Sequence, residues 1–162
     1  MTTPERNARK DQILSPSRTF FATTKTSMGG PLLQSERNVT LWIDWLRSDI
    51  AAGRFQRHDF VIMPDHVHLL ITVSGDSTIE RVTQFIKGGF SYRLKREFGY
   101  LGEVWQRGFT ELRVEDRESY VRHREYIAQN PVRAGLVDSP EKFPTASPIR
   151  QNESQQGLKP AN

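Results

Sequence analysis

Two histidines separated by one residue stand inside an apolar stretch that covers residues 61–71. Alternate side chains of a β-strand share one face of the sheet, so a strand here would point His66 and His68 to the same side. Two neighbouring imidazoles form half of a metal site. A histidine pair of this kind also occurs in purely structural roles, so the other ligands must be found elsewhere in the chain.

A second group of polar residues lies towards the C-terminal end. Tyr126 and Asn130 are four residues apart and share one face of an expected helix, and His123 lies close to that face. Two histidines and an asparagine oxygen can hold an ion such as Mg²⁺ or Mn²⁺ with open positions. A tyrosine one turn away can attack a phosphorus whose oxygens the ion polarises. The ordinary alternatives are packing for Tyr126 and a helix stop for Asn130, which precedes Pro131.

The composition excludes several classes of protein. The 162 residues suffice for one domain with a hydrophobic core. No apolar run approaches the ~18 residues of a membrane span, and the polar N-terminus is not a secretory signal. The absence of cysteine excludes disulfides, thiolate metal sites and cysteine nucleophiles, and it favours the cytosol. The net charge of +4 is compatible with a polyanionic partner.

The apolar pattern predicts the elements that must position these groups. Strands are expected over residues 18–26, 57–63, 66–73 and 109–114. Amphipathic helices are expected over residues 35–52, from about residue 78 past Leu94, and over 117–130. The order β-α-β-β-α-β followed by a helix predicts an α+β, ferredoxin-like antiparallel sheet with an additional C-terminal helix that carries Tyr126.

Two details of the helices are predicted as well. Gly88-Gly89 interrupts the second helix, which indicates a bend or a close approach of another element. The last helix is expected to stop at Pro131. The tryptophans at positions 42, 45 and 105 are expected in the core.

The expected organisation has three parts. Residues 1–17 are polar and aperiodic and are predicted to form a flexible leader. Residues 18–138 form one folded domain. Residues 139–162 are rich in Pro, Ser and Gln, which predicts a disordered tail.

Four segments of the chain are distinctive in their order and spacing. They are MPDHVHLL at 63–70, QFIKG at 84–88, WQRGF at 105–109 and YIAQNPVRAGLV at 126–137. In this order they resemble the REP-associated tyrosine transposases, bacterial relatives of the single-tyrosine insertion-sequence transposases with a His-hydrophobe-His (HUH) motif. The resemblance covers residues 18–138. Asp65 stands where many relatives have Asn, and a turn accepts either residue.

The resemblance implies a role for each matching residue. His66, His68 and Asn130 would be ligands of Mg²⁺ or Mn²⁺, and Tyr126 would be the nucleophile. Tyr126 would attack a phosphodiester of single-stranded DNA with a hairpin structure, as in REP elements. The 3′-hydroxyl would leave, the 5′-phosphate would stay on the tyrosine, and a 3′-hydroxyl from another end would reverse the step to join strands.

Positive charge and stacking surfaces are also expected, because single strands need both. Candidate phosphate contacts are Lys87, Arg93, Lys95, Arg96, Arg107, Arg122 and Arg133. For the residues at 93–96, a solvated helix face is the alternative. The resemblance further implies a cytoplasmic, nucleoid-associated protein without membrane contact. A monomer is preferred to a homodimer, although the tyrosine helix of one subunit would also serve the histidines of another.

Three other functions are compatible with parts of the pattern. A domesticated hairpin-binding protein would bind the same DNA without cutting it, but it would have no use for Tyr126, His66, His68 and Asn130 together. A metal-dependent nuclease that uses water would not need the tyrosine. A replication-initiation nickase shares the chemistry but usually has a longer chain.

Overall fold

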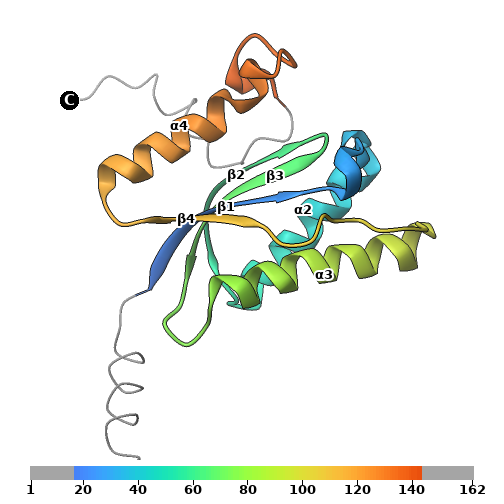
Figure 1. Cartoon of the computed structure of the whole chain (residues 1–162), viewed down its shortest axis with the longest axis horizontal. Helices are drawn as coiled ribbons and strands as arrows, with labels where there is room; N and C mark the ends of the chain where they lie inside the picture. The colour runs from blue at the N-terminus through green and yellow to red at the C-terminus, as the bar shows by residue number, and fades with distance from the viewer. Residues whose placement is uncertain (1–16, 144–162) are drawn as a thin grey trace, which may run out of the picture.

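The computed structural model describes residues 17–143 as a four-stranded antiparallel sheet with helices on both faces (Figure 1). The strands are β1 (Arg18–Lys25), β2 (Gln56–Met63), β3 (His66–Val73) and β4 (Thr110–Val114), in the spatial order β2-β3-β1-β4. The helices are α2 (Glu36–Ala51), α3 (Ile79–Phe98) and α4 (Arg117–Arg133). The α+β class that the sequence predicts is confirmed, and the almost wholly apolar strand β3 lies at a central position of the sheet.

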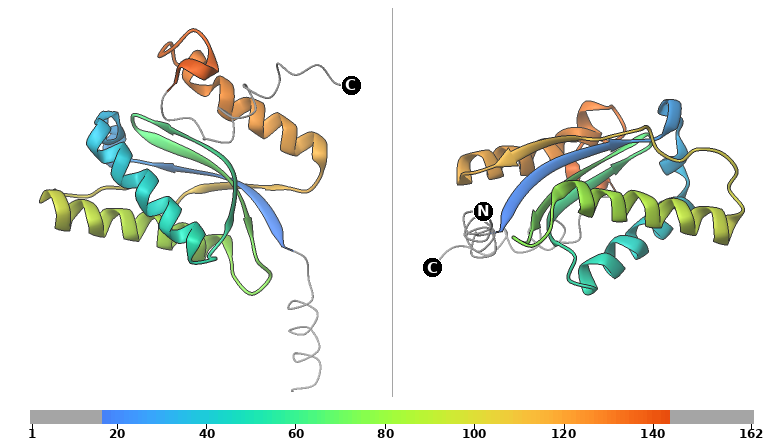
Figure 2. Two further views of the ribbon diagram at one scale, coloured as in Figure 1. Left: turned by 180° about the vertical axis from the view of Figure 1, so that it is seen from behind. Right: turned by 60° about the horizontal axis from the view of Figure 1, so that its bottom comes forward.

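The sheet separates two hydrophobic cores. Helices α2 and α3 lie together on one face, and α4 lies alone on the other (Figures 1 and 2). The side chains of β3 point alternately into the two cores. Val67, Leu69 and Ile71 belong to the larger core, and Leu70 belongs to the smaller core under α4. The two histidines have the same parity as Leu70. They therefore lie on the α4 face.

Helix α3 runs without interruption through Gly88-Gly89, where the expected close approach is present. The indole of Trp45 on α2 lies against Gly89, and its Nε1 donates a hydrogen bond of 3.2 Å to the carbonyl of Ile86. A β-carbon on Gly89 would lie 1.8 Å from Cζ2 of Trp45, whereas one on Gly88 would meet nothing within 4 Å. Gly89 is therefore required by packing, and Gly88 is not.

Adjacent glycine substitutions test this contact. We expect Gly89→Ala to lower the free energy of unfolding by about 1–3 kcal/mol, because the added methyl group forces the hydrogen-bonded indole to move. Gly88→Ala should raise it by up to about 1 kcal/mol through helix propensity. Urea unfolding followed by circular dichroism measures both. Equal stability of the two variants would show that Trp45 moves aside without cost.

Helix α4 does not stop at Pro131, as the sequence predicted, but continues to Arg133. In the last turn a proline removes a single backbone hydrogen bond, and the ring of Pro131 is buried. Gly135, just beyond the C-cap residue Ala134, has a φ of +73°, the left-handed conformation typical of a glycine after a helix C-terminus. The extension places Arg133 on the face of the helix that carries Tyr126.

The described chain extends past the predicted domain boundary at residue 138. A short 3₁₀ helix, Pro140–Lys142, follows, and Phe143 packs in the core under α4. The rest of the predicted tail, and the predicted leader up to residue 16, lie outside the described residues. Between residues 17 and 143, no helix is both long and apolar enough to cross a bilayer.

Candidate active site

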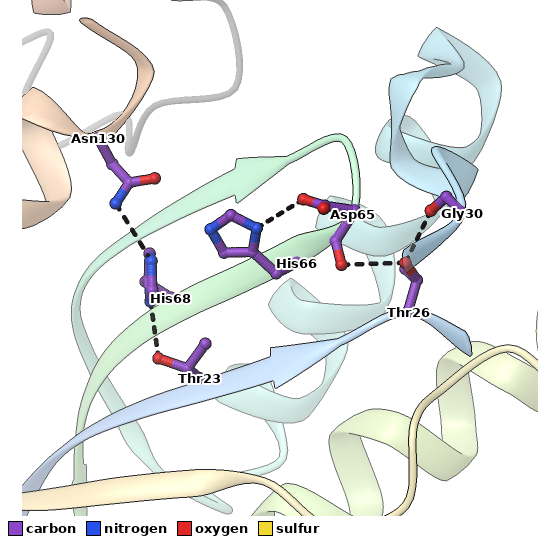
Figure 3. Close-up of polar contacts among 7 residues, drawn as sticks. All are labelled: Thr23, Thr26, Gly30, Asp65, His66, His68 and Asn130. Atoms are coloured by element: carbon purple, nitrogen blue, oxygen red, sulfur yellow. Dashed lines mark hydrogen bonds and ion pairs between the residues drawn. The ribbon is translucent and has the colours of Figure 1, made fainter. Parts of the chain in front are cut away.

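The two histidines lie on the α4 face of β3, with their ring centroids 4.8 Å apart (Figure 3). His68 is held from two sides. Its Nδ1 is 2.7 Å from the hydroxyl of Thr23, its direct cross-strand partner on β1, and its Nε2 is 3.2 Å from Nδ2 of Asn130 on α4. An amide nitrogen can only donate, so Nε2 of His68 accepts this bond and the ring hydrogen is on Nδ1.

The surroundings of His68 favour the neutral imidazole. The residue is 5% exposed, and the ring of Phe21 stacks on it with centroids 5.2 Å apart. Burial, together with the nearby positive charges of His66 and Lys25, lowers the pKa of His68 to about 3. His68 is therefore neutral at physiological pH, which is the form that binds metal ions.

His66 is more accessible and is oriented by its neighbour in the chain. Its Nδ1 is 2.7 Å from a carboxylate oxygen of Asp65 in the turn between β2 and β3. A carboxylate can only accept, so the hydrogen is on Nδ1. The other ring nitrogen lies on the side that faces His68 and Asn130 (Figure 3).

Tyr126, on α4 of the same chain, lies beside His68 and Phe21. Its ring centroid is 5.3 Å from that of His68 and 5.7 Å from that of Phe21. Tyr126 is 38% exposed, so part of the residue is accessible from solvent. The guanidinium of Arg133 lies 5.5 Å from the centre of the tyrosine ring, which puts positive charge beside the candidate nucleophile.

Three contacts fix α4 on the sheet and so determine which of its residues face the histidines. The Tyr120 hydroxyl lies 3.3 Å from Nδ1 of His58, and Nε of Arg124 lies 3.7 Å from Oδ2 of the buried Asp59. Ile127 is buried in the core under the helix. Tyr120, Arg124 and Ile127 follow one another at steps of four and three residues, so they lie on one face of α4. Their contacts with the sheet hold the adjacent Tyr126 beside His68.

The WQRGF segment, residues 105–109, is locked to α3 rather than free. Nε1 of Trp105 donates to the backbone carbonyl of Lys87 at 3.0 Å. In return, Nζ of Lys87 donates to the carbonyls of Gln106 and Gly108 at 2.9 and 2.7 Å. Two of the four motifs of the sequence therefore form one reciprocal contact.

This segment also braces the turn before His66. The amide of Gln106 bonds to the carbonyl of Lys25 at 2.8 Å, and the neighbouring Thr26 bonds to the carbonyl of Asp65 through both its amide and its hydroxyl at 2.9 Å. Asp65 is the residue that orients His66. The motif therefore supports the site although it does not enter it.

The predicted phosphate-binding residues on α3 lie on the other face of the sheet from His68. Arg93 pairs with Asp44 at 2.8 Å and with Glu97 at 2.7 Å, and Arg96 donates to the hydroxyl of Tyr92 at 2.6 Å. A groove of about 450 Å³ between α3 and residues 103–109 contains Lys87 and Lys95. Most of the basic side chains on this face are bonded to neighbouring residues of the same face, and the face is not part of the histidine site.

The remaining basic candidates are spread over two elements. Arg107 is exposed in the WQRGF segment, and Arg122 pairs with Glu118 at 3.3 Å on the outer surface of α4. Arg133 alone contacts Tyr126. Of the seven predicted DNA contacts, the structure brings Arg133 to the site.

Two residues of the site were not singled out by the sequence, and a third was assigned only to a turn. Phe21 and Thr23 on β1 reach His68 because β1 pairs with β3, and a single sequence carries no signal of that register. The carboxylate of Asp65 touches His66, and here adjacency in the chain was a usable signal. No group of three or more His, Cys, Asp or Glu side chains that could hold a metal occurs within residues 17–143, so a metal site here depends on Asn130.

The fold and the site define a class of protein, in which a histidine pair on a central strand lies under a tyrosine and an asparagine from a covering helix. Residues 45–130 match the model of the family described as transposase IS200 like, and they include all four of these residues. The chain belongs to the IS200-like transposase family.

The chain is similar to REP-associated tyrosine transposases within that family. It is 29% identical over 104 residues to a Haemophilus influenzae protein provisionally named so, covering 57% of this chain and 58% of that protein. It is 29% identical over 91 residues to the REP-associated tyrosine transposase of Escherichia coli K12, covering 56% of this chain and 52% of that protein. The chain thus spans little more than half the length of either relative.

A solved structure extends the similarity to most of the chain. The structure of a REP-associated tyrosine transposase bound to a REP hairpin superposes with a TM-score of 0.68 and 26% identity, covering 90% of this chain and 84% of that one. The α+β architecture described above is therefore shared with that protein.

Proposed function

We propose that this chain cleaves and rejoins single-stranded DNA at hairpin, REP-type sequences through a 5′-phosphotyrosine intermediate. The observation that carries the proposal is the meeting of Tyr126 and Asn130 with His68 within one chain. A hydroxyl nucleophile and metal-binding side chains in one accessible place are what a phosphodiester transfer needs. The hairpin in the related solved structure supports the choice of substrate.

The residues present fit a divalent cation. Nε2 of His68 lies 3.2 Å from the side-chain amide of Asn130, and the oxygen of that amide would be the third ligand. His66, His68 and Asn130 would hold the ion. Either Mg²⁺ or Mn²⁺ is proposed, and the two imidazoles make Mn²⁺ the better probe. When bound, the ion would supply Lewis-acid polarisation of a phosphate oxygen.

The chain's own residues carry the group transfer. The oxygen of Tyr126 forms a bond to phosphorus, the bond to the 3′-oxygen breaks, and the 3′-hydroxyl leaves with a proton. The link between Tyr126 and the 5′-phosphate conserves the bond energy, so a 3′-hydroxyl from another end rejoins the strand without ATP. The guanidinium of Arg133, 5.5 Å from the centre of the Tyr126 ring, adds positive charge where the phosphate of the substrate would lie.

Two further parts of the proposal concern architecture. The strand order β2-β3-β1-β4 with all pairs antiparallel supports a ferredoxin-like arrangement. The completeness of the histidine, tyrosine and asparagine set within one chain supports activity as a monomer, because no second subunit is needed to supply α4.

A covalent-adduct assay tests the proposal. The full chain is incubated with Mn²⁺ and a single-stranded DNA hairpin with flanking single strands, labelled at its 3′ end, and the products are resolved on a denaturing protein gel. Because the 5′-phosphate stays on the tyrosine, we expect a labelled band at the mass of the protein plus the DNA fragment on the 3′ side of the cut, which protease digestion removes. Cleavage that leaves a free 5′-phosphate without an adduct would indicate a nuclease that uses water. Binding without cleavage would indicate a hairpin-binding protein.

A further inference from the structure

Both histidines of the site are oriented through Nδ1, and by different groups. Thr23 contacts Nδ1 of His68 at 2.7 Å, and Asp65 contacts Nδ1 of His66 at 2.7 Å (Figure 3). The carboxylate of Asp65 can only accept, so the hydrogen of His66 is on Nδ1 and the lone pair is on Nε2. For His68 the amide nitrogen of Asn130 donates to Nε2, which leaves the hydrogen on Nδ1 to be donated to the hydroxyl of Thr23.

Thr23 is held in place by the sheet rather than by a flexible loop. It lies in the middle of β1, is buried, and pairs directly with His68 on β3. Asp65 is held by the two hydrogen bonds that its carbonyl accepts from Thr26. Both partners of the histidines therefore have fixed backbones, which is what a group that sets ring orientation requires.

We infer that Thr23 and Asp65 are positioning residues that keep the hydrogen of both imidazoles on Nδ1, so that His66 and His68 present Nε2 to one shared point. A group that hydrogen-bonds to the ring nitrogen not used for the metal fixes the tautomer and the orientation of the histidine ring, and its loss lowers the metal affinity. The inference rests on the proposed function for the identity of the bound ion. The hydrogen positions themselves are a property of the metal-free chain.

The first experiment reads the tautomers directly and needs neither metal nor DNA. Long-range ¹H–¹⁵N correlation spectra of the full chain report which ring nitrogen carries hydrogen, and removing each of the four histidines in turn assigns the signals. We expect the Nδ1–H form for His66 and His68 in the wild type. Thr23→Val should admit the Nε2–H form at His68, and Thr23→Ser should restore Nδ1–H.

Thr24→Val is the matched control. Thr24 is the next residue of β1, is also buried, and points to the other face of the sheet. Within residues 17–143 its hydroxyl has no hydrogen-bond partner. This variant should leave the tautomer of His68 unchanged. The Nε2–H form of His68 in the wild type, or an unchanged tautomer in Thr23→Val, would overturn the inference for Thr23.

The second experiment measures Mn²⁺ affinity from the electron paramagnetic resonance signal of free Mn²⁺. Thr23→Val should bind Mn²⁺ about 10–100-fold more weakly than Thr24→Val, the range expected for loss of a group behind a ligand. Asp65→Ala should lose affinity in the same range, while Asp65→Asn keeps an acceptor oxygen and should not. Equal affinity in Thr23→Val and Thr24→Val, or in Asp65→Ala and Asp65→Asn, would overturn the positioning role.

The two experiments separate this inference from the proposed function. A wild-type chain that shows the expected tautomers but binds no Mn²⁺ and forms no DNA adduct contradicts the proposed function and leaves the orientation of the rings established. A chain that forms the adduct with the Nε2–H tautomer at His68 contradicts the inference alone.

Discussion

The Tyr126→Phe variant should bind the DNA hairpin as the wild type does and should form no covalent adduct with it. The change removes one oxygen, and the ring can keep its edge contact with His68 and its contact with Arg133. We expect the cleavage rate to fall by roughly 10³-fold or more, as when a nucleophile is removed from other enzymes. Labelled hairpin cleavage under single-turnover conditions measures the rate, and a mobility shift measures binding.

Tyr120→Phe is the matched control for this variant. Tyr120 lies on the same helix, and its hydroxyl contacts His58 rather than the histidine pair. Loss of that hydrogen bond should lower stability by about 0.5–1.5 kcal/mol and leave the cleavage rate near that of the wild type. Full cleavage by Tyr126→Phe, with a free 5′-phosphate as product, would remove the tyrosine from the mechanism and favour attack by water.

The His68→Ala variant should lose both Mn²⁺ binding and cleavage. His68 is the ligand candidate with the most contacts, because Thr23, Asn130 and Phe21 all touch it. Since the loss of a group behind a ligand costs about 10–100-fold in affinity, loss of the ligand should cost at least about 100-fold. Addition of excess Mg²⁺ or Mn²⁺ should not restore the rate. The measurements are Mn²⁺ titration and hairpin cleavage across metal concentrations.

His58→Ala provides the comparison. His58 lies on the adjacent strand β2 and, like His68, contacts a threonine hydroxyl on the sheet and a residue of α4, in its case Thr72 and Tyr120. It tests whether removing a half-buried histidine from this face is enough to stop activity by destabilising the fold. We expect it to lower the thermal midpoint and to retain metal-dependent cleavage. Unchanged Mn²⁺ affinity in His68→Ala would exclude His68 as a ligand.

Local periodicity accounts for what could be predicted from the residues. The side chains of a strand alternate, so His66 and His68 had to share a face once residues 66–73 formed a strand. Tyr126 and Asn130 had to share a face once residues 117–130 were helical. Ser35 caps α2 as its residue type allows, through a bond from the amide of Asn38.

The predicted end of the last helix at Pro131 was wrong, and the reason lies in the neighbouring residues of the chain. Pro131 was expected to stop the last helix because it lacks an amide hydrogen. In the last turn the loss is small, and Gly135, just beyond the C-cap residue, adopts a positive φ. The error matters for the site, since the additional residues of the helix bring Arg133 to Tyr126.

The sequence by itself determined the strand that carries His66 and His68, the helix that carries Tyr126 and Asn130, and a common face on each, because alternation and the helical repeat depend on neighbours in the chain. Only the tertiary structure decided that these faces meet within one chain. It also placed Thr23 behind His68, and it left the basic residues of α3 on the far side of the sheet. Strand register and helix docking depend on contacts between residues far apart in sequence, such as Thr23 with His68 and Arg124 with Asp59, and no local pattern records them.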